Sequence, residues 1–346
     1  MAGLTIAPSS ILGKSHGHVP PSDRLNIAAV GIGGMGHTNI NHVKATENIV
    51  ALCDVDWRYA KGVFDELPNA KKYWDYRKMY DEMGKDIDAV IIATADHTHA
   101  IITADAMTMG KHVYCQKPLT HSVYESRLLT RLAASTGVVT QMGNQGSSDE
   151  GTDLVCEWIW NGEIGDVSMI QANFGSYKDY DMKNRFFNMN LAGGAMLDIG
   201  VYAISLARCF LKSKPDNVIS TVKFAPSGVD EMSGIVMTNK EGQMTVISLS
   251  LHTKQPKRCV ICGDKGYIEI MEYPRACKAT IVCTETGERK EICEGETERA
   301  LQYEMEDMEE EISKRSGCML REYTKDVMEI MTDIRNEWGL KYPEEQ

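Results

Sequence analysis

The sequence is short of basic residues and of long apolar runs. It carries 37 Lys and Arg against 49 Asp and Glu, for a formal net charge of −12 at pH 7. Such a surface would repel a nucleic-acid backbone, so nucleic acid is not an expected partner. No apolar run approaches the ~18–20 residues that span a bilayer, so no membrane partner is expected. The remaining composition is ordinary for a globular protein of two domains.

The ten cysteines lack the spacing of a disulfide framework. Cys259 and Cys262 form a C-x-x-C, but they lie in a strand-like run, where positions three apart face opposite sides. Such a pair cannot easily share one ion, so no metal site is expected. Cysteines scattered through apparent strands and helices are typical of buried thiols in a reducing compartment, which predicts a cytoplasmic protein.

Residues 1–23 leave a second location open. They are mildly apolar, rich in small residues, and end in a polar stretch with Pro20 and Pro21. They resemble the trailing end of a twin-arginine export signal, although no arginine pair precedes them. The segment is therefore interpreted as either a disordered arm or a signal remnant, and the remnant would indicate a periplasmic protein.

Residues 27–36 carry the strongest local pattern. Four apolar residues predict a strand buried on both faces, and Gly31, Gly33 and Gly36 follow in G-x-G-x-x-G spacing. The next helix should direct free N–H groups at a pyrophosphate. A second apolar strand, 49–53, ends at Asp54, where a carboxylate can accept the adenosine ribose hydroxyls. The pattern predicts dinucleotide binding.

Strands and helices alternate as far as residue 145, which predicts an α/β fold with a doubly wound parallel sheet in residues 24–145. Residues 146–346 show short strands separated by turn signals and predict an α+β domain with an open, mostly antiparallel sheet for substrate and oligomer contacts. Helices are expected at 57–67, 73–83, 97–109, 122–135, 150–161, 195–211, 298–315 and 322–337. The acidic run 304–311 is interpreted as a solvated helix face.

Three later stretches carry the stronger candidate chemistry. His97 and His99 lie where a strand meets a helix and are either ligands or polar helix-start residues. Lys117 lies at the mouth of a strand and is fixed by a proline, where its charge can stabilise an alkoxide or lower the pKa of a hydroxyl. Asp198 and Tyr202 are four apart and share one helix face, so they could move a proton near that lysine.

Two weaker candidates complete the set. Arg185 lies in a polar loop, where it could clamp a substrate hydroxyl or carboxylate or simply be a surface arginine. The stretch 141–145 lies at the junction of the two halves, where its amides could contact a ligand or satisfy the crossover backbone.

These stretches together resemble the Gfo/Idh/MocA oxidoreductase family. The resemblance covers nearly the whole chain from Arg24 to Tyr342, and it depends on the loop 31–36 and the stretches 93–99, 116–118 and 194–202. It implies an N-terminal Rossmann domain and a C-terminal domain whose open sheet often forms oligomers, here a homodimer or homotetramer. It also implies a nicotinamide cofactor and sugar or polyol substrates.

The chain departs from the common family pattern in ways that narrow the resemblance. The usual Glu-Lys-Pro is Gln116-Lys117-Pro118, the motif histidine is Tyr202, and a usual aspartate is Ser205. This combination of residues is similar to the tyrosine branch of the family, which includes dihydrodiol dehydrogenase, glucose-fructose oxidoreductase and D-xylose dehydrogenases. The branch implies Tyr202 as acid/base, Lys117 lowering its pKa, and Asp198 as the residue that orients the substrate or the tyrosine.

The two halves resemble different relatives. Residues 25–165 look like exported bacterial members that include redox-assisted glycosidases, and residues 168–342 look like the dihydrodiol-dehydrogenase branch. A shared ancestor or a hybrid chain would each explain this.

The expected function is hydride transfer between a nicotinamide and a hydroxyl or carbonyl of a sugar, polyol or diol. Asp54 favours NAD over a 2′-phosphorylated cofactor, although Arg58 could accommodate NADP. The alternatives are a redox-assisted glycoside hydrolase that retains NAD and a non-catalytic nucleotide sensor. The expected cofactor contacts are Gly31, Ile32, Gly33, Gly34, Met35, Gly36, Asp54, Ala93, Thr94, Asp96, His99, Gln116, Lys117 and Gln145. The expected substrate contacts are Lys117, Arg185, Asp198 and Tyr202.

Overall fold

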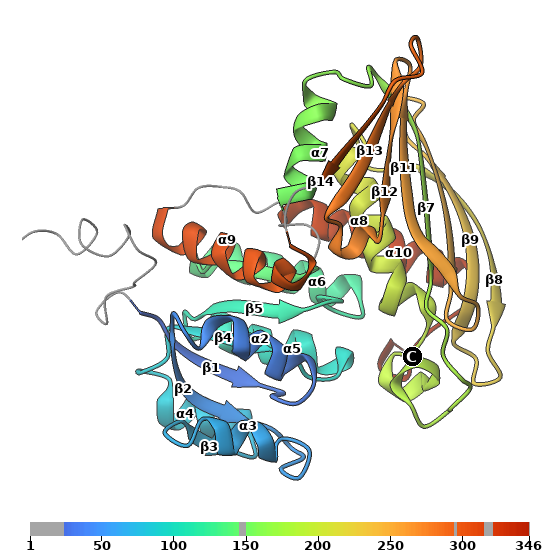
Figure 1. Ribbon diagram of the computed structural model, residues 1–346. Helices are drawn as coiled ribbons and strands as arrows, with labels where there is room; N and C mark the ends of the chain where they lie inside the picture. The colour runs from blue at the N-terminus through green and yellow to red at the C-terminus, as the bar shows by residue number, and fades with distance from the viewer. Residues whose placement is uncertain (1–23, 145–149, 294–295, 315–320, 346) are drawn as a thin grey trace, which may run out of the picture.

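The fold is built on two separate β-sheets (Figure 1). The computed structural model describes residues 24–144, 150–293, 296–314 and 321–345, so the arm 1–23 lies outside the described residues. The chain builds the first sheet from residues before 145 and the second from residues after 150.

Sheet A is parallel, with the strand order β3-β2-β1-β4-β5-β6. Its central strands are buried on both faces, as their uninterrupted apolar sequences predict. The order reverses between β1 and β4, and such a switch point is where parallel sheets bind ligands at their carboxyl edge. Its strands are β1 Asn26–Val30, β2 Asn48–Cys53, β3 Lys71–Tyr73, β4 Ala89–Ile92, β5 His112–Gln116 and β6 Thr140–Gly143.

Helices cover both faces of sheet A. Apolar side chains of α4, α5 and α6 pack on one face, and those of α2, α3 and α9 pack on the other. Local signals start some of these helices: Ser122 and Glu125 form a capping box at α6, and Asp75 caps α4. The helices are α2 Met35–Val43, α3 Lys61–Glu66, α4 Tyr76–Met83, α5 His99–Thr108, α6 Val123–Thr136 and α9 Ala300–Lys314, with the 3₁₀ turn η1 Asp96–Thr98 before α5.

Sheet B has the order β14-β13-β12-β11-β7-β10-β9-β8. Only β7 and β10 pair in parallel, so the predicted mostly antiparallel sheet is confirmed. One face packs on α7, α8 and α10. The strands are β7 Val167–Gly175, β8 Asn217–Phe224, β9 Asp230–Thr238, β10 Met244–Ser250, β11 Gln255–Gly263, β12 Gly266–Met271, β13 Lys278–Cys283 and β14 Arg289–Cys293. The remaining elements are α7 Glu150–Trp160, η2 Arg185–Phe187, η3 Met189–Leu191, η4 Met196–Gly200, α8 Val201–Phe210, η5 Tyr273–Arg275, η6 Thr297–Arg299, α10 Arg321–Glu337 and η7 Pro343–Glu345.

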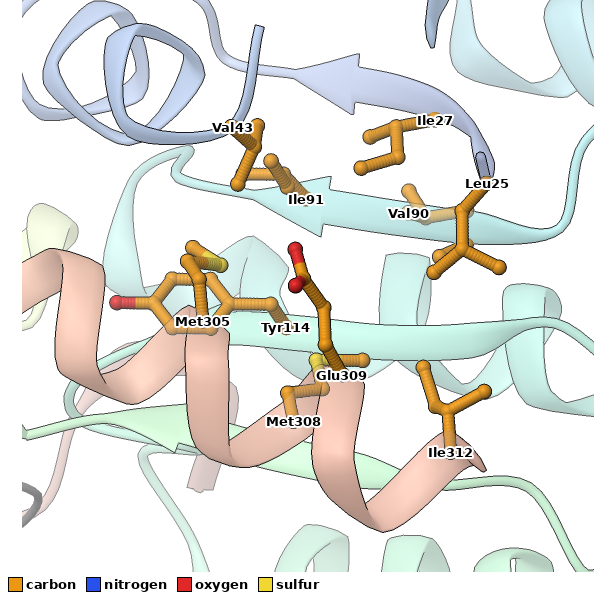
Figure 2. Close-up of a pocket in the computed structure, with 11 residues that line it drawn as sticks. Leu25, Ile27, Val43, Val90, Ile91, Tyr114, Met305, Met308, Glu309 and Ile312 are labelled. Carbon is orange, nitrogen blue, oxygen red and sulfur yellow. The ribbon is translucent and has the colours of Figure 1, made fainter. Parts of the chain in front are cut away.

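Helix α9 returns from the second sheet to cover the first. Met305 and Met308 join the core of sheet A, and they line a small cavity with Tyr114 and strands β1 and β4 (Figure 2). The expectation of a solvated acidic face is wrong here, because Glu304 is fully buried and Glu311 is nearly so. Apolar residues at helical spacing draw this part of the run against the sheet.

Several expected helix boundaries differ from the structure. The stretch 57–67 becomes helical only at Lys61, because the carboxylate of Asp56 accepts the N–H groups of Arg58 and Tyr59 in a turn. Residue 73 ends strand β3 instead of opening a helix. The stretch 195–211 begins as the π-helical η4 before continuing as α8.

The segment Met189–Phe210, which runs from η3 through η4 and α8, is long and apolar enough by composition to cross a membrane, which the sequence reading overlooked. Its most apolar window is 72% buried inside the protein, as expected for a core helix.

Candidate functional site

The glycine loop joins β1 to α2 in the geometry that a dinucleotide needs. Gly31 has a φ of 76°, and a Cβ at Gly36 would lie 1.8 Å from the carbonyl oxygen of Gly31. Only glycine fits at either position. The N-terminus of α2 has Gly34 as its cap and receives no side-chain hydrogen bond, so its dipole is open to a phosphate. These features fit the pyrophosphate of a dinucleotide.

Asp54 is bound to this loop through its own carboxylate. Its Oδ2 accepts hydrogen bonds from the backbone N–H groups of Ile32, at 2.9 Å, and Gly33, at 3.4 Å. The ring of Tyr59 covers Gly33, at the place where a Cβ on that residue would project. The predicted contact of Asp54 with a ribose would therefore share a carboxylate that already holds the loop, and it stays a prediction.

His99 lies beneath the site and clamps two strand ends. It is 1% exposed, and its Nδ1 and Nε2 lie 2.7 and 3.1 Å from the carbonyl oxygens of Pro118 and Thr94. Burial works to lower the pKa of His99, but Cys115, Asp96 and the Pro118 carbonyl raise it to about 9. Two carbonyl partners require two N–H donors, so the ring is an imidazolium that joins the ends of β4 and β5.

An alternating chain of charges crosses between the two sheets. Lys117 Nζ lies 2.6 Å from the carbonyl oxygen of Asp198 and 3.1 Å from its Oδ1. Arg185 Nη2 lies 2.9 Å from the same Oδ1, and its Nη1 lies 3.7 Å from Asp96 Oδ2. We call Asp96, Lys117, Arg185 and Asp198 the interdomain ionic cluster. It brings together three of the expected substrate contacts, Lys117, Arg185 and Asp198, and two of the expected cofactor contacts, Asp96 and Lys117.

The charges of this cluster stabilise one another. Burial would raise the pKa of Asp198, but Lys117 and Arg185 overcome it and hold that pKa below its ordinary value. Burial would lower the pKa of Lys117, but Asp198, Tyr202 and Asp96 raise it. Both groups therefore remain charged at neutral pH although both are about nine-tenths buried.

The contact between Lys117 and the carbonyl oxygen of Asp198 lies in the π-helical turn η4. In η4 the N–H of Val201 bonds to the carbonyl of Met196, five residues back, in place of the α-helical partner. The carbonyl oxygen of Asp198, inside this turn, accepts a hydrogen bond from the ammonium of Lys117. Single π-helical turns occur frequently at functional sites.

Tyr202 completes the site. Lys117 Nζ lies 4.8 Å from the centre of its ring. Burial raises the pKa of Tyr202, and the charge of Lys117 offsets only part of that rise. Lys117 thus acts in the expected direction, while the net shift is upward because the phenol is buried. No hydrogen bond to the Tyr202 hydroxyl is formed within residues 24–144, 150–293, 296–314 and 321–345, so this hydroxyl can meet a substrate there.

Gln116 is buried beside Lys117, where it bonds to Asn39 and Tyr114. Ala93 closes against the glycine loop, since a Cβ at Gly31 would lie 2.7 Å from the carbonyl carbon of Ala93. Gln145 lies outside the described residues.

Asp230 is a buried group that the sequence reading missed. Its Oδ2 accepts the N–H of Met196 at 2.6 Å, and a Cβ on Gly194 would lie 2.1 Å from its Oδ1. Burial raises the pKa of Asp230 to about 7, partly offset by the Met196 N–H. The carboxyl holds the start of η4 and explains the glycine at 194. Nothing in the local sequence distinguishes this aspartate, since the contact joins residues far apart in the chain.

Family profiles match both halves of the chain. A profile described as an oxidoreductase family with an NAD-binding Rossmann fold matches residues 25–144, and a profile described as the GFO/IDH/MocA C-terminal domain matches residues 153–269.

Individual relatives agree with the profiles. D-xylose 1-dehydrogenase (NADP(+)) 2 of Haloferax volcanii is 31% identical over 247 residues, which are 71% of this chain and 74% of the relative. Trans-1,2-dihydrobenzene-1,2-diol dehydrogenase of Xenopus laevis is 28% identical over 228 residues, 65% of this chain and 67% of the relative.

The fold is also shared with solved structures. Aldose-aldose oxidoreductase from Caulobacter crescentus, complexed with glycerol, superposes with a TM-score of 0.80 at 18% identity and covers 90% of this chain and 97% of that chain. The structure of KijD10, a 3-ketoreductase from Actinomadura kijaniata with NADP and TDP-benzene, also gives 0.80, at 17% identity and with the same coverage. The chain therefore belongs to the Gfo/Idh/MocA family and is an NAD(P)-binding oxidoreductase.

Proposed function

We propose that this oxidoreductase interconverts a hydroxyl and a carbonyl group on a sugar, polyol or related diol. The observation that carries the proposal is the convergence of Lys117, Asp198 and Tyr202 beside the carboxyl edge of sheet A, next to the glycine loop. The relatives' names agree, since they describe enzymes of xylose, a dihydrodiol and aldoses.

A nicotinamide dinucleotide held by the glycine loop 31–36 would supply the acceptor or donor of the hydride. Tyr202 holds the proton that the substrate oxygen gains or loses. The ammonium of Lys117 favours the phenolate and the developing alkoxide. Asp198 keeps Lys117 in place, and Arg185, with its side chain 46% exposed, binds a substrate oxygen from the open side.

The raised pKa of Tyr202 gives the two directions of the reaction different pH dependences. At neutral pH the phenol is protonated, so it is ready to give a proton to a carbonyl during reduction. Oxidation needs the phenolate, so its rate should rise as pH approaches the pKa of Tyr202.

We propose NAD as the preferred cofactor and NADP as the alternative. The negative charge of Asp54 lies at the end of β2, where it would oppose a 2′-phosphate. Arg58 has a side chain that is 97% exposed and could turn toward that phosphate. Equilibrium binding of NAD and NADP to the purified chain distinguishes them.

Tyr202→Phe tests the proposed reaction. We expect turnover of the best substrate from a panel of aldoses, polyols and glycosides to fall by about 10²–10⁴-fold, because the acid/base group is removed. Cofactor affinity measured by calorimetry should stay within about threefold. Unchanged turnover would contradict the role of Tyr202. Glycoside cleavage without net NADH would instead indicate a redox-assisted hydrolase, and tight NAD binding without turnover would indicate a sensor.

We also propose that copies associate through the outer face of sheet B. Ile219 and Val246 are exposed there, and both are cross-strand neighbours of Val236. Exposed apolar rows of this kind mark interaction surfaces. Val246→Glu should reduce the molecular mass measured by light scattering to that of the monomer, whereas an unchanged mass would place the interface elsewhere.

A further inference from the structure

A buried hydrogen-bond chain connects the returning helix α9 to the cofactor side of β5. Oε2 of Glu304, on α9, accepts the hydroxyl of Tyr114 at 2.7 Å. The amide nitrogen of Gln116 donates to the oxygen of Tyr114 at 3.1 Å and to Oδ1 of Asn39 at 3.3 Å. All four side chains are at most 5% exposed. Figure 2 shows the ring of Tyr114 against α9, beside Met305.

The donors and acceptors in this chain allow one orientation of the Gln116 amide. Tyr114 has a single proton, and it gives that proton to the carboxylate of Glu304. The phenol oxygen can therefore only accept from Gln116, so the amide nitrogen must face it. Asn39 must then offer its oxygen to the second N–H of Gln116, and its own Nδ2 has no partner among the described residues.

Packing leaves little room for another arrangement. A Cβ at Gly143 would lie 2.4 Å from the Tyr114 hydroxyl and 2.9 Å from Nε2 of Gln116, so glycine is needed on β6 beside this pair. The amide oxygen Oε1 of Gln116 has no hydrogen bond to the described part of the chain. Gln116 directly precedes Lys117 at the carboxyl end of β5, where the proposed function places the cofactor.

We propose that Glu304 is a positioning residue for the cofactor site: through Tyr114 it orients the Gln116 amide so that the acceptor Oε1 is the atom offered to the nicotinamide side. This inference rests on the proposed function for the cofactor contact of Gln116. It also explains why a glutamine replaces the more usual glutamate. A carboxylate at 116 could not donate to Tyr114 and would compete with Glu304 for its one proton.

The orientation is tested with two dinucleotides that differ at one group. NAD carries a carboxamide on its pyridine ring, and nicotinic acid adenine dinucleotide carries a carboxylate, which an acceptor oxygen repels. We expect the full chain to bind NAD at least about tenfold more tightly, measured by calorimetry. Glu304→Gln and Tyr114→Phe should reduce this preference to about threefold or less, because the amide can then turn over. Glu306→Gln, an exposed change on the same helix, should leave the preference unchanged.

A preference that is the same in Glu304→Gln as in the parent chain would overturn the inference. If the parent chain binds neither dinucleotide, the proposed function fails, and a second measurement still decides the linkage.

The second measurement is the melting temperature of variants at positions 116 and 304. Gln116→Glu should lower the melting temperature, and adding Glu304→Gln should restore at least half of the loss, because one of the two neighbouring carboxylates is then replaced by an amide. If Gln116→Glu lowers the melting temperature by the same amount in the parent chain and in Glu304→Gln, the linkage between the two residues is contradicted.

The charge of Glu304 also has a kinetic signature, which is separate from the orientation of the Gln116 amide. The charge of Glu304 contributes to the raised pKa of Tyr202. The alkaline limb of the oxidation rate should therefore move to lower pH in Glu304→Gln. A merely structural role for Glu304 would lower the rate without moving this limb.

Discussion

Carboxylates in two regions of this molecule, the buried Asp198 and the partly buried Glu309, have opposite pKa shifts. In the interdomain ionic cluster, Lys117 and Arg185 both bond to Asp198, and the pKa of that carboxyl is lowered. Where α9 packs on sheet A, a contact that we call the α9 seam, burial raises the pKa of Glu309 to about 7, and the charges of Glu47 and Glu306 add to the rise. The direction of the pKa shift of a carboxyl therefore depends more on the sign of the neighbouring charges than on how deeply the carboxyl is buried.

The charge of Asp198 is balanced by neighbouring cations, whereas the charge of Glu309 is opposed by burial and by neighbouring carboxylates. In the ionic cluster, Lys117 and Arg185 favour the ionised form of Asp198, and Asp198 favours the charged form of both cations, which suits chemistry that must stabilise an alkoxide. At the α9 seam, the carboxyl of Glu309 lies against apolar side chains of β1, β4 and β5 (Figure 2). Its ionisation opposes folding there, so the two regions should respond oppositely to mutation and to pH.

The largest effect should follow from Lys117→Met, which removes the central cation of the ionic cluster. We expect kcat/KM to fall by about 10²–10³-fold, because Tyr202 and the developing alkoxide lose their nearest positive charge. The free energy of unfolding should fall by roughly 2 kcal/mol, since Asp198 keeps Arg185 as its remaining partner. Lys214→Met removes a more exposed pair with Glu329 and should cost less than about 1 kcal/mol with no change in activity. If Lys117→Met and Lys214→Met changed activity and stability by equal amounts, the special role of the ionic cluster would be refuted.

A smaller effect should follow from His99→Gln beneath the ionic cluster. The folded pKa of about 9 lies above the unfolded value of 6.5, so the imidazolium contributes stability that is full below pH 6.5. That contribution is lost as pH rises through 9. Chemical unfolding at pH 6 should show the variant less stable by roughly 2 kcal/mol, and the difference should shrink by pH 10. A pH-independent difference would mean that His99 is neutral.

The smallest effect, of opposite sign, should follow from Glu309→Gln at the α9 seam. The folded pKa is raised above the unfolded value, so the protonated form favours folding at low pH and this advantage is lost as pH rises toward 7. Removing the charge should therefore stabilise the protein by roughly 1 kcal/mol at pH 8 and by almost nothing at pH 4. Glu337→Gln, an exposed change on α10, serves as the control. A destabilised variant at pH 8 would show that the carboxylate has a favourable partner.

Local sequence was sufficient for much of the site. The glycine loop, Lys117 and the pair Asp198 and Tyr202 were recognisable because each lies at a strand end or on one helix face, where spacing alone fixes direction. Asp230 and Glu304 were not recognisable, because their partners lie 34 and 190 positions away in the chain. Apolar residues at helical spacing through Leu301, Met305, Met308 and Ile312 were a usable signal that α9 has a buried face.

The sequence by itself determined the alternation of strands and helices and the dinucleotide loop, and it singled out the candidate side chains Lys117, Asp198 and Tyr202, since these depend on residue type and short-range spacing. Only the tertiary structure decided which charges face one another. It placed Arg185 on Asp198, turned His99 toward two carbonyl oxygens, and returned α9 to sheet A so that Glu304 meets Tyr114. Coulombic and hydrogen-bond energies depend on distance in space, and a one-dimensional sequence does not contain the distances that folding creates.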